Sequence, residues 1–284
     1  MELCDISQIK NLLNRNGFRF SKSMGQNFLT ASWVPKQIAE EAELSPEIGV
    51  LEVGPGIGCL TVELAKLAGK VFAVELDRNL APVLAETLAD CENAEVLFGD
   101  VLKLPLAELV AERLSGLRPV VCANLPYNIT SPLISAFIDA HCFEAMTLMV
   151  QREVAHRICA KAGTSDYGAF TVYTNWYTEP EILFDVSPDC FMPQPKVVSS
   201  VIHLKVRKTP PAEVVSEELF FKVVRASFNQ RRKTLLNGLS SGLSGYSKEA
   251  LAGVIVGCGL DEKIRGETLD IAGFARVANA IAAL

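Results

Sequence analysis

Val50-Leu51-Glu52-Val53-Gly54-Pro55-Gly56-Ile57-Gly58 is a short apolar run, suited to a buried strand, that leads into three glycines at alternate positions. The next residues, 59–68, have the pattern of a helix. In such a strand–turn–helix the missing β-carbons let the backbone approach a ligand, and free N–H groups at the helix start face it. A tight structural turn would need the same glycines. A nucleotide site is favoured by Glu75, 21 residues after Gly54 at the end of the next apolar run, where a carboxylate can meet ribose hydroxyls.

The spacing of these glycines bears on which nucleotide is bound. Dinucleotide sites favour G-x-G-x-x-G, whose third glycine lets the helix pack closely on the strand. Here the pattern is G-x-G-x-G and the next residue is Cys59, which argues against NAD. The pattern resembles motif I of the S-adenosylmethionine-dependent methyltransferases. That resemblance implies that Gly54, Gly56 and Gly58 curl beneath the amino-acid end of S-adenosylmethionine.

The composition and the cysteine pattern indicate a cytosolic protein with a sizeable core. The chain has 284 residues, of which 49% are hydrophobic. It contains no apolar run of about 18 residues, so we expect no membrane span, and the mixed charges of residues 1–11 do not suggest a signal peptide. The eight cysteines are scattered singly, which predicts reduced thiols and neither disulfides nor a metal site.

The charge is unevenly distributed along the chain. The net charge is −6, yet residues 8–36 carry five Lys or Arg and no acid, and residues 196–233 carry nine against three Glu. Two basic stretches could form one face against phosphate. Solvated helices that never meet would show the same distribution.

Apolar and amphipathic segments alternate after residue 49. We expect strands over 50–53, 71–74, 96–98, 120–123 and 146–150, and helices over 59–68, 79–91 and 131–140. This alternation is typical of an α/β fold with a mostly parallel sheet covered on both faces.

Four polar or glycine positions follow strand ends at regular intervals. Gly54, Glu75, Asp100 and Asn124 are separated by 21, 25 and 24 residues. Right-handed crossovers place the carboxyl ends of parallel strands along one edge, and the ligand crevice of an open α/β sheet lies outside that edge. We therefore expect these four positions to converge.

The second half of the chain changes character. Residues 153–162 and 167–177 have helical patterns, and 182–186 with 197–205 predict an antiparallel strand pair at the sheet edge. Pro210-Pro211 marks the expected boundary between a catalytic domain, 1–209, and a small helical domain, 210–284. Helices in the latter are expected over 217–228, 233–239, 248–258 and 271–284. In the catalytic domain, the N-terminal segment around residues 25–30 could fold over a ligand as a lid.

Asn124-Leu125-Pro126-Tyr127 follows a buried strand at the expected crevice. The Asn124 side-chain carbonyl and a backbone carbonyl near the proline can accept the two N–H bonds of an exocyclic amine, and the Tyr127 ring can stack on its base. An amine held in this way directs its lone pair at an electrophile. Methyl transfer from a sulfonium needs mainly such positioning and no metal. A plain strand-to-turn connection is the structural alternative.

Several motifs together resemble one family. Asn124 to Tyr127 looks like motif IV of adenine-N6 methyltransferases in the form found in rRNA enzymes. Lys22-Ser23-Met24-Gly25-Gln26-Asn27-Phe28-Leu29 and Phe191-Met192-Pro193-Gln194-Pro195-Lys196-Val197 are similar to signatures of the rRNA adenine dimethyltransferases, as is the stretch from Glu52 to Gly58. The basic segment Ala226 to Leu235 resembles a segment in the C-terminal helical domain of one group within this family. The enzymes of that group dimethylate two adjacent adenosines in the 3′-terminal hairpin loop of 16S rRNA within the small ribosomal subunit.

The resemblance implies three groups of site residues. Those at the cofactor would be Asn27, Leu29, Gly54, Gly56, Gly58, Glu75, Leu76, Asp100, Val101 and Asn124, with Gly54 at the methionine end, Glu75 at the ribose and Asp100 at the adenine amine. Those at the target base would be Asn124, Leu125, Pro126, Tyr127 and Phe191, with the two aromatic rings stacked on a flipped base. Those at rRNA phosphates would be Arg225, Arg231, Arg232 and Lys233.

Other functions remain as alternatives at this stage. A resistance-type methyltransferase of large-subunit rRNA would share the glycine loop and N-L-P-Y, and the longer basic C-terminal segment favours the small-subunit enzyme. An RNA-binding assembly factor on the same fold would not need Asn124. A DNA adenine methyltransferase more often has D-P-P-Y, and a nicotinamide dehydrogenase would need a hydride-transfer acid. We expect a cytoplasmic monomer that acts in small-subunit biogenesis.

Overall fold

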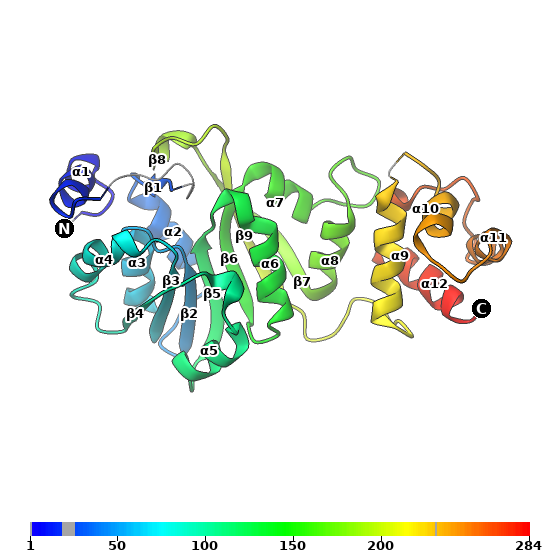
Figure 1. The fold of residues 1–284 in the computed structure, drawn as a ribbon, viewed down its shortest axis with the longest axis horizontal. Helices are drawn as coiled ribbons and strands as arrows, with labels where there is room; N and C mark the ends of the chain where they lie inside the picture. Colours follow the sequence, from blue (N-terminus) through cyan, green and yellow to red (C-terminus); the bar gives the residue numbers. More distant parts are fainter. Residues whose placement is uncertain (1, 19–25, 231) are drawn as a thin grey trace. The chain divides into compact units, whose positions relative to one another are not determined.

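The computed structural model describes residues 2–18, 26–230 and 232–284, and the chain forms two compact units (Figure 1). The first unit contains residues 1–155 and 180–206, and the second contains residues 156–179 and 207–284. Compactness thus groups residues 156–179 with the C-terminal helices, whereas the sequence suggested a single boundary after residue 209.

The first unit is built on a seven-stranded sheet with the strand order β4-β3-β2-β5-β6-β9-β7. The strands, including the two of a separate small sheet, are β1 (Phe28–Leu29), β2 (Ile48–Val53), β3 (Lys70–Glu75), β4 (Ala94–Phe98), β5 (Arg118–Asn124), β6 (Ala145–Gln151), β7 (Thr178–Val186), β8 (Phe191–Met192) and β9 (Ser199–Val206). In this order the first five strands, β4, β3, β2, β5 and β6, are mutually parallel, and β9 runs antiparallel to β6. The predicted α/β fold, with an antiparallel element at one side of the sheet, is confirmed.

Helices cover both faces of this sheet. The helices of the chain are α1 (Ile6–Arg15), α2 (Trp33–Glu41), α3 (Cys59–Leu67), α4 (Ala81–Thr87), α5 (Leu106–Arg113), α6 (Thr130–Asp139), α7 (Arg152–Ile158), α8 (Ala169–Tyr177), α9 (Glu217–Asn229), α10 (Leu235–Gly242), α11 (Lys248–Gly257) and α12 (Ile271–Ala282). Apolar residues of α1 to α4 form one core with Val50, Val71 and Val120 of the sheet. Figure 1 shows α5 and α6 on the opposite side, where Arg113 of α5 lies over the Phe72 ring.

The turn between β2 and α3 depends on glycine. Gly54, Gly56 and Gly58 have φ values of +72°, +60° and +89°, in the left-handed region where a β-carbon is unfavourable. Gly58 is also the residue that precedes the first turn of α3. The sequence pattern therefore encodes a backbone path that brings the end of β2 sharply into a helix.

The second unit packs α8 to α12 around its own core. Trp176 of α8 lies against Phe220 of α9, with ring centroids 4.2 Å apart, and Phe274 of α12 is fully buried in the same cluster. Side-chain N-caps begin α9, α10, α11 and α12, from Ser216, Thr234, Ser247 and Asp270 respectively. Each cap satisfies a backbone N–H that the helix cannot pair internally.

Two predicted helices end earlier than their sequence patterns suggested. The helix predicted over 79–91 ends at Thr87, and the Asn93 side chain ties the following turn to the carbonyls of Ala65 and Ala68. The helix predicted over 153–162 ends at Ile158, where α8 supplies donors to the last carbonyls, from Asn175 to Ile158 and from Thr171 to Arg157. At the end of α7, tertiary hydrogen bonds thus satisfy the carbonyls that a further helical turn would have paired.

Other elements differ from the prediction in existence or start. The helix α5 and the two-residue strands β1 and β8 were not predicted, and α10 begins at Leu235 because Thr234 caps it. Among the described residues, none of the helices has both the length and the apolar character required to cross a membrane.

Candidate functional site

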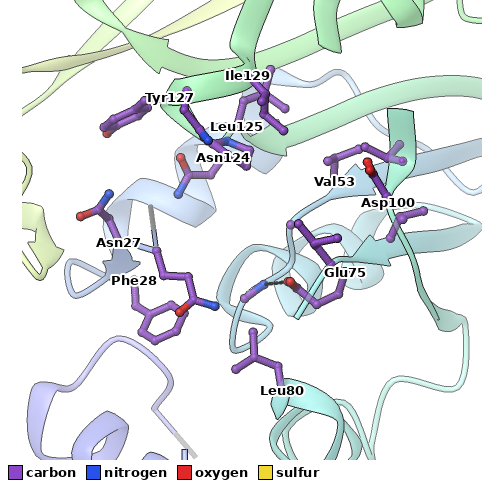
Figure 2. Close-up of a pocket in the computed structure, with 18 of the residues that line it drawn as sticks. Asn27, Phe28, Val53, Glu75, Leu80, Asp100, Asn124, Leu125, Tyr127 and Ile129 are labelled. Carbon is purple, nitrogen blue, oxygen red and sulfur yellow. Dashed lines mark hydrogen bonds between the residues drawn. The ribbon is translucent and has the colours of Figure 1, made fainter. Parts of the chain in front are cut away.

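A cavity of about 150 Å³ lies at the carboxyl ends of β2, β3, β4 and β5. All four positions expected to converge, Gly54, Glu75, Asp100 and Asn124, line it. Figure 2 shows Tyr127, Asn124 and Asn27 toward one end of the cavity, and Glu75 and Asp100 toward the other. The cavity therefore has an end with amide and aromatic groups and an end with carboxylates.

Glu75 is a buried carboxylate that braces the glycine loop. Its Oε2 accepts a hydrogen bond from the N–H of Gly56 at 3.2 Å, and its Oε1 accepts from the N–H of Asp77 at 2.8 Å. Burial raises the pKa of Glu75 above the ordinary glutamate value, and the two backbone N–H groups partly oppose this shift. Since a carboxylate has about four acceptor positions, Glu75 can still accept from two further donors.

Asp100 begins a short 3-10 helix just after β4. Its Oδ1 accepts from the N–H of Leu102 at 3.2 Å, and its Oδ2 lies 3.1 Å from the Lys103 ammonium. Leu76 and Val101, each directly after one of the two acids, also line the cavity. They supply apolar surface beside polar groups, as expected for a nucleoside site.

The Asn124 to Tyr127 turn is held from three sides. The N–H of Leu125 donates to the Met149 carbonyl of β6 at 3.1 Å, and the Thr130 hydroxyl donates to the Pro126 carbonyl at 3.1 Å. The Tyr127 hydroxyl lies 2.6 Å from the Ser199 hydroxyl of β9. Burial raises the pKa of the Tyr127 phenol, and this hydrogen bond partly opposes the shift. The turn is thus preorganised beside the cavity.

The described part of the N-terminal segment also reaches the cavity. Gln26, Asn27 and Phe28 line it, and the Gln26 amide donates to Asp77 at 2.9 Å. The Phe28 ring packs against the glycine loop so closely that a β-carbon added to Gly56 would lie 3.2 Å from it. Residues 22–25 of the expected lid signature lie outside the described residues.

Three of the residues predicted for the cofactor or the target base are not among the cavity's lining residues. Leu29 and Phe191 face each other in the small β1–β8 sheet and are 4% and 2% exposed. The Phe191 ring would have to be uncovered before it could stack on a base. Gly58 is at the start of α3, where an added β-carbon would lie 3.1 Å from atoms of Thr87 and Leu88.

The residues predicted for RNA contact belong to the second unit. Arg225 of α9 is exposed, as are Arg232 and Lys233 in the segment between α9 and α10. Arg231 lies outside the described residues.

Eight lining residues were not singled out by the sequence interpretation. They are Gln26, Phe28, Val53, Val74, Leu80, Gly99, Asn128 and Ile129. All of them except Leu80 lie within two positions of a predicted site residue, so their closeness in sequence to those residues was the signal that could have found them. Leu80 is different, because it comes from the turn before α4 and carries no polar signal.

Glu52 of β2 is a buried acid next to this site. It is 1% exposed, and its Oε2 and the hydroxyl of Thr61 are both buried without a hydrogen-bond partner in the described part of the chain. Burial raises the pKa of Glu52 to about 8, and the negative charge of Glu75 adds to the increase. Among the described residues, no group of three or more His, Cys, Asp or Glu is placed to hold a metal ion.

Comparison with known proteins identifies relatives over nearly the whole chain. A family model described as ribosomal RNA adenine dimethylase matches residues 17–282. A ribosomal RNA small subunit methyltransferase A from Geobacillus kaustophilus is 47% identical over 97% of this chain and 95% of its own length. A protein of the same name from Alkaliphilus metalliredigens is 45% identical over 98% and 97% respectively.

Solved structures with a similar fold include a dimethyladenosine transferase and a 23S rRNA methyltransferase. A dimethyladenosine transferase from Plasmodium falciparum is 27% identical, with a TM-score of 0.72, and the match covers 88% of this chain and 95% of that one. The 23S rRNA methyltransferase ErmE is 28% identical, with a TM-score of 0.68, over 90% and 99% of the two chains.

Proposed function

We propose that this chain, which belongs to the ribosomal RNA adenine dimethylase family, dimethylates the N6 amines of two adjacent adenosines in the 3′-terminal hairpin loop of 16S rRNA. The observation that carries this proposal is that the Asn124 to Tyr127 turn opens onto the same cavity as Gly54, Glu75 and Asp100. One cavity thus combines acceptors for an amine with the groups expected around a nucleoside cofactor.

The residues present fit S-adenosylmethionine. A β-carbon placed on Gly54 would meet no atom within 4 Å, so the backbone leaves open space beside the cavity for the methionine end. Glu75 keeps acceptor positions for two ribose hydroxyls, and Asp100 can accept from the adenine amine. When bound, this cofactor supplies a methyl group carried on an electrophilic sulfonium.

The turn's own groups would hold the target amine. The Asn124 side-chain carbonyl accepts one N–H of the amine. The Pro126 carbonyl already accepts from the N–H of Ile129 at 3.3 Å and from the Thr130 hydroxyl at 3.1 Å, so the neighbouring Leu125 carbonyl is the better second acceptor. Two acceptors in the plane of the base turn the nitrogen lone pair toward the cavity. Tyr127 stacks on the base, which must leave its loop to enter.

The second unit would supply most of the electrostatic attraction for RNA. Arg225, Arg232 and Lys233 are exposed cations within the strongly basic stretch 196–233. In this proposal residues 1–209 carry the chemistry and residues 210–284 bind rRNA. Because the substrate is ribosomal, we expect a cytoplasmic protein that acts during small-subunit biogenesis, and a monomer supplies every group that this proposal uses.

A second candidate is dimethylation of large-subunit rRNA, as suggested by the structural relative ErmE, a 23S rRNA methyltransferase. The similarity of 45–47% to relatives named for the small subunit, over nearly the full chain, favours the small-subunit substrate. A ribosome-assembly factor without methyl transfer is the remaining alternative, and the preserved amine-binding turn argues against it.

The decisive experiment incubates the protein with labelled S-adenosylmethionine and small subunits from cells that lack this modification. Large subunits and duplex DNA serve as parallel substrates. We expect dimethyladenosine in the small-subunit rRNA alone. Label in large-subunit rRNA would establish the second candidate instead, and binding to small subunits without label would indicate an assembly factor.

A further inference from the structure

Tyr127 is anchored from a strand two places away in the sheet. Asn124, which ends β5, pairs in register with Met149 of β6, and Gln151 at the end of β6 pairs with Ser199 at the start of β9. Because β9 runs antiparallel to β6, its first residue lies at the same sheet edge as the carboxyl ends of β5 and β6. This arrangement brings the Ser199 hydroxyl within 2.6 Å of the Tyr127 hydroxyl.

The environment of this hydrogen bond makes it a firm constraint. Ser199 is 0% exposed, so water cannot readily replace its hydroxyl. Tyr127 is partly buried, and its phenol has a raised pKa, which keeps the hydroxyl neutral and able to donate or accept. A tyrosine ring turns about two side-chain torsions. Fixing the phenol oxygen limits the first torsion, and because the phenol O–H prefers the plane of the ring, the direction of the hydrogen bond to Ser199 favours one ring plane and so limits the second. The ring plane therefore depends on Ser199.

We infer that Ser199 is a positioning residue for methyl transfer, because it fixes the plane of the ring on which the target adenine stacks. This inference rests on the proposed function, since it assumes that Tyr127 meets the base. Ser199 itself need not touch the substrate. Its action would pass through Tyr127, whose ring orientation sets the direction of the amine held by Asn124.

The neighbouring serine offers a matched control. Ser200 is also 0% exposed, and its hydroxyl donates to Asp185 of β7 at 2.5 Å. Successive side chains of a strand point in opposite directions, so Ser200→Ala removes an equally buried hydrogen bond from the same strand without altering Tyr127.

The first test is a double-mutant cycle on methyl transfer to small subunits. We expect Ser199→Ala and Tyr127→Phe each to lower kcat about fivefold, which corresponds to the net free energy of one hydrogen bond. The KM for the small subunit should change less than about twofold, because phosphate contacts dominate binding. The double variant should be no slower than either single variant. Ser199→Thr, which keeps the hydroxyl, should recover most of kcat, and Ser200→Ala should match the wild type.

A second readout does not depend on activity. The protein is labelled with ¹³C at the tyrosine Cζ and its NMR spectrum is recorded. Because the chain has only five tyrosines, the Tyr127 signal can be assigned as the one that is lost in Tyr127→Phe. The Ser199 hydrogen bond lowers the pKa of Tyr127, so Ser199→Ala should shift this signal and raise that pKa, whereas Ser200→Ala should leave both unchanged.

The possible results separate this inference from the proposed function. Multiplicative effects of the two single variants, or an unshifted Tyr127 signal in Ser199→Ala, would overturn the positioning role while wild-type methylation stands. Wild-type protein that transfers no methyl group to rRNA would overturn the proposed function, and the role of Ser199 in transfer with it.

Discussion

Asn124 shares one cavity with residues that are near it and residues that are far from it in the sequence. It ends β5 and lines the cavity together with Tyr127 and with Gly54 of the glycine loop that follows β2. Its side chain is an amide, so it can accept from an amine without bringing a charge that would compete for the cofactor's sulfonium. The sequence suggested this role, and the geometry is consistent with it.

Replacement of Asn124 should therefore affect transfer far more than folding. We expect Asn124→Ala to lower kcat by about a hundredfold or more, because the amine loses its orienting acceptor. Calorimetry should find cofactor affinity retained in part. Asn14→Ala, which alters an exposed asparagine of α1, is the control and should behave as wild type. Wild-type turnover in Asn124→Ala would rule out the assigned role.

Glu52 should make stability depend on pH. The folded protein keeps the Glu52 proton up to about pH 8, whereas an ordinary glutamate loses it near 4.5. Between these values the folded state holds more protons, so this group's contribution to the free energy of unfolding falls as pH rises, by at most about 1.4 kcal/mol per pH unit. Glu52→Gln should remove that dependence and be more stable than wild type near pH 8.

Denaturant unfolding at pH 5, 6, 7 and 8 would measure this effect. Trp33 belongs to the first unit and Trp176 to the second, so a Trp176→Phe background leaves Trp33 fluorescence as a reporter of the unit that contains Glu52. Glu40→Gln, at an exposed position of α2, should leave the pH profile unchanged. Identical slopes for Glu52→Gln and wild type would show that Glu52 titrates normally.

At the scale of elements, the glycine loop combines a backbone requirement with a ligand requirement. Gly54 and Gly116 have similar φ values, +72° and +79°, and an added β-carbon would meet no atom within 4 Å at either position. Gly54 lines the cavity, whereas Gly116 is exposed in the loop after α5. The pair can therefore separate backbone strain from loss of binding.

Alanine at either glycine should cost about 1–2 kcal/mol of folding free energy, because the left-handed backbone disfavours a β-carbon. We expect Gly54→Ala in addition to weaken S-adenosylmethionine binding at least about tenfold, since the methyl group would occupy space at the cavity. Thermal unfolding and calorimetric titration of both variants would test this. Equal cofactor affinity in the two variants would place the methionine end elsewhere.

At the scale of the whole molecule, we propose that function divides between the unit that holds the cavity and the unit that carries the three exposed cations. The net charge is −6, so attraction for RNA must come from a local concentration of Lys and Arg and not from the overall charge. The three described candidates lie at and just beyond the end of α9.

Removing these charges should weaken rRNA binding and its dependence on salt. We expect the triple variant Arg225→Ala, Arg232→Ala, Lys233→Ala to reduce the slope of log affinity against log salt by about two, at about 0.7–0.9 per lost phosphate contact. The matched control replaces Lys248, Lys263 and Arg276, three exposed cations elsewhere in the same unit. Equal slopes in the two triple variants would mean that the RNA surface lies elsewhere.

Local patterns in the sequence were sufficient for the parts of the molecule that depend on short-range physics. Alternating strands and helices, glycines at left-handed positions and polar residues at strand ends predicted the parallel sheet and the convergence of Gly54, Glu75, Asp100 and Asn124. Periodicity did not predict where α7 stops, because side chains of α8 satisfy its last carbonyls.

Only the tertiary structure decided the contacts that depend on how strands far apart in the sequence pair with one another. The placement of Phe191 beside Leu29 follows from the pairing of β1 with β8. The hydrogen bond between Tyr127 and Ser199, 72 positions apart in the chain, requires β9 to start beside the ends of β5 and β6. No local pattern encodes these contacts, since each joins residues far apart in sequence whose proximity depends on how the strands pair.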